Sequence, residues 1–295
     1  MDLVEKIKIL QNHLKVRNFK KVIESSKVLL NKMPNNDYLL NITGMAYQGL
    51  SQHDNSIKCF NRALKHSPNN IAAMNNLANS LKAIGKLEES KDLYENILKI
   101  NPNYINAYNN YANLKTLVND YDGAIQLYKK AYSIIEKMDN VPNSTVTGIL
   151  FSLAAAYQSA NKIEETQEIV KKILSIDPSH VGAHKLTGSL IKYSNDNEES
   201  MKHIKEMEEV DKQINDQDLL KKVDISYALG KSYEDLKNFE KAFHYLSKAN
   251  QLKFDKKGSN LEAEKKAIRN IVKIFEGIDL KNSNIEPQEK KIIFI

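Results

Sequence analysis

Cysteine, tryptophan, glycine and proline are all scarce in this sequence of 295 residues. It contains 1 cysteine, no tryptophan, 10 glycines and 6 prolines. One cysteine excludes an intramolecular disulfide framework and a structural zinc site built on cysteine pairs. We therefore expect a reducing compartment, most simply the cytoplasm. Because 41% of the residues are hydrophobic and 27% are charged, the chain can nevertheless bury a core.

Long hydrophobic runs are also missing. Charged residues interrupt the apolar positions of segment 1–15, so it lacks the hydrophobic region of a secretory signal. The longest uncharged stretch, 140–161, contains proline, asparagine, serine and threonine, which argues against a membrane span. The formal net charge of +6 comes from dispersed basic residues rather than from a basic stripe. We expect neither membrane insertion nor nucleic-acid binding.

Sequence motifs of catalysis are absent too. There is no glycine-rich phosphate loop, no nucleophile elbow and no H-E-x-x-H motif. His180 and His184 have a spacing that a metal site can use, but a third ligand is missing, so we expect ordinary packing or surface histidines. Cys59 lies beside an apolar position and is expected to fill space. We expect no catalytic residue, no metal and no cofactor in this chain.

What the sequence does contain is a period. Pro34, Pro68 and Pro102 are 34 residues apart, and the later prolines and glycines keep this period after shifts of eight residues. Insertions at 139–146 and 215–222 account for those shifts. A fixed period of this length is typical of repeat proteins. The chain then divides into seven units: 3–36, 37–70, 71–104, 105–138, 147–180, 181–214 and 223–256.

Small residues recur at two positions of these units. Bulky residues surround them at helical spacing, which predicts two helices per unit whose backbones approach closely. Proline at position 32 stops the second helix, and Gly85 and Asn119 mark turns between paired helices. The small residues at position 8 are Gly44, Ala78, Ala112, Ala154, Gly188 and Gly230; those at position 20 are Ser56, Ser90, Ala124, Thr166, Ser200 and Ala242.

This pattern resembles the tetratricopeptide repeat (TPR), most clearly over 71–113. The resemblance covers about 250 of the 295 residues and implies an all-α, right-handed solenoid of about seven helix pairs. Some positions depart from the pattern. Leu10 replaces the small residue of the first unit, Lys212 replaces the proline of unit 181–214, and Lys115 stands at a bulky position, so the local packing is in question there.

Asparagines gather on the first helices of successive units. In such repeats the first helices line a concave groove, so these side chains form a candidate peptide-binding face. An amide both donates and accepts hydrogen bonds and can bind a peptide backbone. The pattern is similar to the asparagine ladder of O-linked N-acetylglucosamine transferase. The alternative is a face that is merely solvated. The candidate residues are Asn41, Asn75, Asn76, Asn79, Asn109, Asn110 and Asn113.

The C-terminal part differs from the repeats. Apolar residues at helical spacing predict a capping helix over 257–280. A polar linker, 281–291, then leads to four apolar residues, 292–295, which are typical of the start of a buried parallel strand or of an apolar tail. The stretch 227–252 together with this ending resembles bacterial proteins that fuse TPRs to a sulfotransferase domain. That resemblance implies phosphoadenosine phosphosulfate (PAPS) as cofactor only if such a domain follows.

The sequence therefore predicts a protein- or peptide-binding module, not an enzyme in the chain as given. Our first hypothesis is that the chain is the substrate-recruiting N-terminal region of a sulfotransferase. The alternatives are a free-standing scaffold for protein complexes and the repeat arm of an O-GlcNAc-transferase-like glycosyltransferase. The sequence indicates no oligomeric state.

Overall fold

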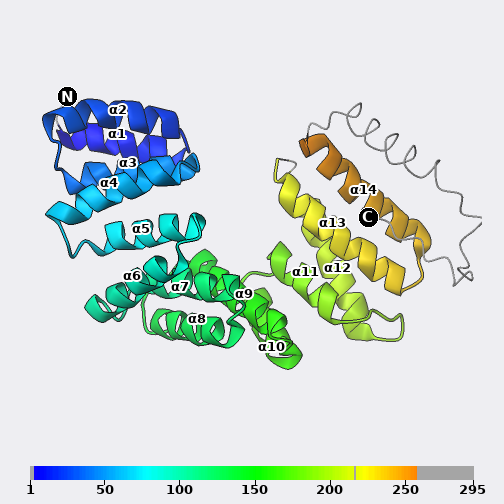
Figure 1. The fold of residues 1–295 in the computed structure, drawn as a ribbon. Coiled ribbons are helices and arrows are strands. Elements are labelled where there is room, and N and C mark those ends of the chain that lie inside the picture. The colour runs from blue at the N-terminus through cyan, green and yellow to red at the C-terminus, as the bar shows by residue number, and fades with distance from the viewer. Residues whose placement is uncertain (1–2, 216, 258–295) are drawn as a thin grey trace, which may run out of the picture. The chain divides into compact units, whose positions relative to one another are not determined.

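A computed structural model of the chain describes residues 3–215 and 217–257, and these residues form helices without strands (Figure 1). The predicted all-α TPR-like solenoid is confirmed. The described helices fall into two compact units, which divide between Ile191 and Lys192. The first contains α1 (Leu3–Lys15), α2 (Phe19–Lys32), α3 (Asp37–Gly49), α4 (His53–His66), α5 (Ile71–Ala83), α6 (Leu87–Ile100), α7 (Ile105–Leu117), α8 (Tyr121–Ile135), α9 (Asn143–Ser159), α10 (Ile163–Ile176) and α11 (Val181–Leu190). The second contains α12 (Glu198–Gln213), α13 (Leu219–Asp235) and α14 (Phe239–Lys257).

The turns between paired helices share one backbone conformation. Gly85 and Asn119 have positive φ values of 81° and 61°, as the sequence predicts. The same position 15 is also left-handed in four further pairs, although most of its residue types give no such signal. The turn geometry is therefore imposed by the packing of the two helices. These four residues are Arg17, Ser51, Asn161 and Lys237.

Small residues at position 8 let the paired helices approach, as predicted. A Cβ atom added to Gly44 of α3 would lie 2.4 Å from the ring of Phe60 of α4. Phe60 is fully buried, so the ring occupies the volume that a side chain at residue 44 would need. The two helices contact each other through this position, and the core continues from one pair to the next.

Both insertions lengthen the helix that follows them. The first helices α3, α5 and α7 have 13 residues each, whereas α9 and α13 have 17. Each long helix begins four residues before the repeat boundary that the period predicts, at Asn143 and Leu219. Half of each insertion therefore becomes an extra N-terminal turn instead of a loop.

The division between the compact units falls within the expected unit 181–214. Its first helix, α11, has only 10 residues, and the chain leaves it in an extended conformation at Ile191. Asn195, at position 15, is not among the left-handed residues found in the other turns. The expected pair is thus divided, with α11 in one compact unit and α12 in the other. Apart from Lys257, which ends α14, the expected capping helix 257–280 and the segment 281–295 lie outside the described residues.

Candidate functional site

The candidate residues lie on three first helices that follow one another in the first compact unit. α3 contributes Asn41, and α5 and α7 each contribute three asparagines. α3 packs against α5, and α5 packs against α7. We call the seven side chains the asparagine face. Its members on α5 and α7 are Asn75, Asn76, Asn79, Asn109, Asn110 and Asn113.

Two amide pairs connect these helices. Asn76 Nδ2 donates to Asn41 Oδ1, and Asn110 Nδ2 donates to Asn75 Oδ1, each at 3.0 Å. Both pairs join position 5 of one unit to position 6 of the next, 35 residues later. Asn75 is 6% exposed, so its bond is made away from bulk solvent. The four asparagines of these pairs therefore have a structural role, because they connect successive repeats.

Gln48 extends this amide network, and the sequence analysis did not identify it. Its Nε2 donates to the backbone oxygen of Asn76 and to Ser80 Oγ, both at 2.8 Å. Ser80 Oγ lies 2.7 Å from Ser56 Oγ in the core. Gln48 occupies position 12, one of the positions that line the groove in such repeats. That position is the signal in the sequence that points to Gln48, although its residue type differs from the asparagines of the face.

The asparagines at position 9 bind tyrosines of the paired second helices. Tyr94 Oη donates to Asn79 Oδ1, and Tyr128 Oη donates to Asn113 Oδ1, each at 2.7 Å. Burial raises the pKa of Tyr94 to about 12 and also raises the pKa of Tyr128, so both hydroxyls stay protonated donors at neutral pH. Position 24 is tyrosine in the two units that have asparagine at position 9, and this pairing is visible in the sequence.

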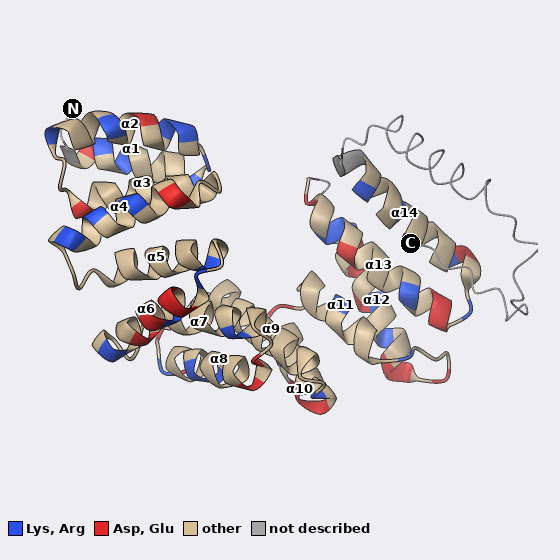
Figure 2. Ribbon diagram, in the orientation of Figure 1, with Lys and Arg blue, Asp and Glu red and all other residues tan. Residues whose placement is uncertain are grey.

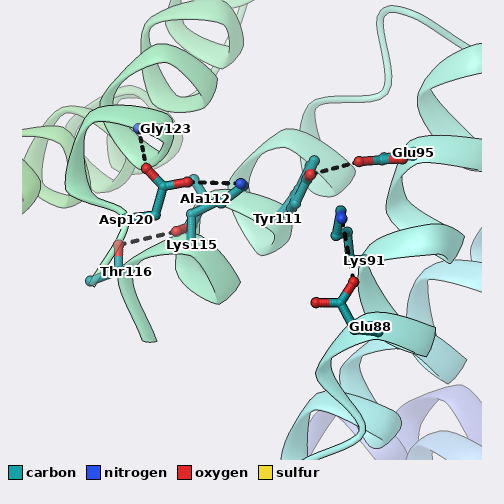
Figure 3. A network of polar contacts seen from close by, with 9 residues as sticks. All are labelled: Glu88, Lys91, Glu95, Tyr111, Ala112, Lys115, Thr116, Asp120 and Gly123. Carbon is teal, nitrogen blue, oxygen red and sulfur yellow. Dashed lines mark hydrogen bonds and ion pairs between the residues drawn. The ribbon is translucent and has the colours of Figure 1, made fainter. Parts of the chain in front are cut away.

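A polar network lies beside these pairs (Figure 3). Tyr111 Oη donates to Glu95 Oε1 at 2.8 Å, and burial followed by this bond raises the pKa of Tyr111. Lys115 Nζ lies 5.7 Å from the Tyr111 ring centroid and donates to Asp120 Oδ2 at 2.7 Å. The hydrogen bond from Lys115 lowers the pKa of Asp120, which also accepts from the Gly123 amide at the start of α8. Lys115 is thus accommodated at its unusual position by an aromatic ring and a helix cap.

Several polar atoms of the asparagine face keep hydrogen-bonding capacity. The half-buried side chain of Asn109 makes no hydrogen bond to any described residue. Asn113 is exposed, and Asn76 and Asn110 use their amide nitrogens in the pairs while their oxygens can still accept. The face therefore presents donors and acceptors whose orientation is fixed by neighbouring helices.

The remaining candidate residues have local roles. His180 caps α11 by accepting from the Ala183 amide at 3.1 Å, and His184 Nε2 lies 2.8 Å from the oxygen of Pro178. Cys59 is half-buried, and burial raises the pKa of its thiol, which disfavours the reactive thiolate. Within 3–215 and 217–257, no three histidine, cysteine or acidic side chains gather as a metal site would need. None of the described helices is long and apolar enough to cross a membrane.

Two family models, both described as tetratricopeptide repeat, match the sequence. One matches 69–137, and the other matches 39–70 and 223–256. The chain contains tetratricopeptide repeats. TPRs are protein-interaction modules, and the residues of the asparagine face fall within the matched segments. No curated protein matches the sequence.

Several solved structures share the fold. A tetratricopeptide repeat protein from Parabacteroides merdae ATCC 43184 is 18% identical, with a TM-score of 0.58, over 90% of this chain and 96% of that one. The C-terminal part of a TPR repeat-containing protein from Cytophaga hutchinsonii is 13% identical, with a TM-score of 0.58, over 83% and 94% of the two chains. PilF of Pseudomonas aeruginosa is 17% identical, with a TM-score of 0.56, over 78% and 96%. Identities this low support the fold alone.

Proposed function

We propose that this TPR chain binds an extended peptide segment of a partner protein along the asparagine face. The observation that carries the proposal is the row of amides on α3, α5 and α7, joined helix to helix by Asn41–Asn76 and Asn75–Asn110. An extended peptide exposes alternating backbone donors and acceptors along its length. Amides fixed in a row meet such a backbone without selecting its side chains.

The internal hydrogen bonds favour this function because they reduce the cost of binding. A free asparagine loses side-chain freedom when it binds a ligand, whereas Asn75 and Asn110 are already held by each other. Asn109 and Asn113 then provide amide groups beside the held pair. We infer that the paired amides orient the face and that the ligand contacts the atoms left open.

The test is a peptide selected on the intact chain from a random library of extended sequences. We expect the double variant Asn109→Ala/Asn113→Ala to lower the affinity for that peptide about tenfold, since two hydrogen bonds are lost. Asn31→Ala is the control, because Asn31 is an exposed asparagine of α2 that is not part of the asparagine face. Methylation of alternate backbone nitrogens of the peptide should lower its affinity for the wild-type chain by a similar factor. Equal affinity of the double variant, or a loss in the control, would contradict the proposal.

We further propose that this module recruits substrates for a sulfotransferase domain that uses PAPS. The resemblance of 227–252 and of the apolar residues 292–295 to TPR–sulfotransferase junctions favours this context. A free-standing cytoplasmic scaffold for protein complexes is equally consistent with the TPR fold, and the asparagine row favours the arm of a glycosyltransferase. Sequencing the gene beyond codon 295 tests the first: we expect an open frame with a phosphate-binding loop. A frame without that loop contradicts the sulfotransferase context and leaves the peptide test unaffected.

A further inference from the structure

A groove separate from the asparagine face lies among α4, α5 and α6. Its volume is about 570 Å³, which is within the usual range for ligand pockets. Leu77 and Leu81 of α5 form a buried apolar floor, and Ile84, at the end of that helix, is 39% exposed. Ile57 and Leu93 add half-buried apolar surface from the flanking second helices. The groove can therefore take apolar side chains of a partner.

The rim of this groove is acidic in a chain that is basic overall. Asp54 of α4 and Glu89 and Asp92 of α6 are exposed and line it, whereas Lys86 is the one cationic side chain among the described residues that line it. Lys86 is already paired with Glu89, at 2.7 Å. Asp54 and Asp92 form no salt bridge with any described residue. Figure 2 shows the concentration of acidic residues in the first part of α6.

The arrangement suits a peptide better than an ion. These carboxylates are not gathered as ligands of one metal, because the described residues contain no such cluster. They border an apolar floor instead, so a ligand gains from the groove only if it carries both apolar and cationic groups. Asn61 and Asn96 lie at the rim and can hydrogen-bond to a peptide backbone.

We propose that this groove is a second docking site, for a basic segment of a partner protein that anchors one or two aliphatic side chains. The anchors lie on Leu77, Leu81 and Ile84, and flanking lysines or arginines pair with Asp54, Glu89 and Asp92. The cation–carboxylate pairs give the site its selectivity, and the apolar floor gives it depth. The site is independent of the asparagine face and does not depend on the function proposed for it.

The probe is a labelled ten-residue peptide, RKLIRKLARK, measured by fluorescence anisotropy with the full chain at 0.1 M KCl. The reference peptide, QQLIQQLAQQ, has the same apolar residues without charge and should bind at least tenfold more weakly. The variant Asp54→Asn/Glu89→Gln/Asp92→Asn should lower the affinity for the basic peptide at least tenfold, since it removes the three negative charges of the rim. Ile84→Ser, which alters only the floor, should weaken both peptides a few-fold.

The matched control is Glu164→Gln/Glu168→Gln/Glu198→Gln, which changes net charge equally at exposed sites outside the groove. We expect it to retain affinity within about twofold, and bound peptide to slow amide hydrogen exchange in 54–61 and 86–96. Similar losses in both triple variants would reduce the effect to overall charge and overturn the proposal. Absence of binding by the basic peptide, or exchange protection confined to the asparagine face, would overturn it as well.

Discussion

Three successive first helices of the first compact unit and the three helices of the second are connected by different polar chemistry. In the first unit, α3, α5 and α7 are joined by neutral amides such as the Asn75–Asn110 pair. In the second unit, Glu208 of α12 accepts from Tyr233 of α13 at 2.6 Å and from Lys241 of α14 at 3.4 Å. Asp211 of α12 also pairs with Lys248 of α14 at 2.7 Å. The helices α3, α5 and α7 are thus connected by amides, whereas α12, α13 and α14 are connected by a phenol–carboxylate bond and ion pairs.

This difference indicates that the backbone pattern does not dictate the polar groups that connect repeats. Amide pairs carry no charge and do not titrate, so they are insensitive to salt and pH. Ion pairs depend on both, and those near the surface contribute little. Neutral amides also offer hydrogen-bond donors and acceptors to a ligand without placing a charge at the site. The predictions below test how far this contrast extends.

The largest effect on stability is expected at the position 8 glycines. Replacing them with alanine tests whether the cores of the two compact units differ in how well they accept an added methyl group. Gly44→Ala places a Cβ atom 2.4 Å from the fully buried Phe60 ring. We expect a loss of about 2 kcal/mol in the first unit, because overpacking exceeds the gain of about 1 kcal/mol in helix propensity. Hydrogen exchange resolved by segment gives the opening free energy of each unit.

Two further glycines are the controls for that substitution. At Gly230 the nearest atom to an added Cβ is Leu246 Cδ2 at 2.6 Å, a flexible and half-buried side chain. We expect Gly230→Ala to change stability by less than about 1 kcal/mol. No atom lies within 4 Å at Gly148, so Gly148→Ala should stabilise α9 by about 1 kcal/mol. Equal losses at Gly44 and Gly230 would contradict the expected difference.

Alkaline pH should destabilise both units through buried tyrosines. Burial raises the pKa of Tyr94 in the first unit and of Tyr193 in the second to about 12. The folded chain then holds more protons than the unfolded chain between pH 10 and 12, so stability is lost as pH rises through this window. Ionisation of each tyrosine should lower the free energy of unfolding by about 1.3 kcal/mol at pH 11 relative to pH 9. Tyr94→Phe and Tyr193→Phe should each flatten the dependence in their own unit; an unchanged slope would contradict the assignment.

The amide pairs make a smaller contribution. Asn75→Ala removes the acceptor of Asn110 from a position that is 6% exposed, so we expect a loss of about 1 kcal/mol in the first unit. Asn109 belongs to the same asparagine face but has no side-chain partner among the described residues, so Asn109→Ala should change stability by less than about 0.5 kcal/mol. Denaturant unfolding measures both. Indistinguishable values would show that the pair is not stabilising.

The sequence predicted the helix pairs because their signals are local. Spacing, small residues at position 8 and turn residues such as Gly85 all lie within one unit. The left-handed turn at Arg17, Ser51 and Lys237 was missed, because packing imposes it on residues with no preference for it. The extra turns of α9 and α13 were missed because an insertion of eight residues carries no sign of how much of it is helical.

The asparagine face was found by residue type, but its internal bonds were not. A bond between residues 35 apart, such as Asn41–Asn76, depends on how one unit superposes on the next. The rotation between units is set by the core, and no periodicity in the sequence reveals it. The pairing of Asn79 with Tyr94 could be predicted from the sequence, since both residue types recur together in the following repeat.

The smallest expected effect is a difference between the two units in how strongly salt lowers their stability. Raising KCl from 0.1 to 1 M shortens the Debye length from about 10 to about 3 Å, which weakens partly exposed ion pairs. Asp211 and Lys248 have side chains 11% and 31% exposed, so screening should reduce their contribution by about 0.5 kcal/mol in α12–α14. The amide-linked α3 and α5 should lose less. Asp211→Asn should reduce the salt response of the second unit, whereas Asn75→Ala should leave that of the first unchanged. If both units responded equally to salt in the wild-type chain, the contrast between amide and ionic connections would have no energetic consequence, because the surface charges common to both units would then dominate.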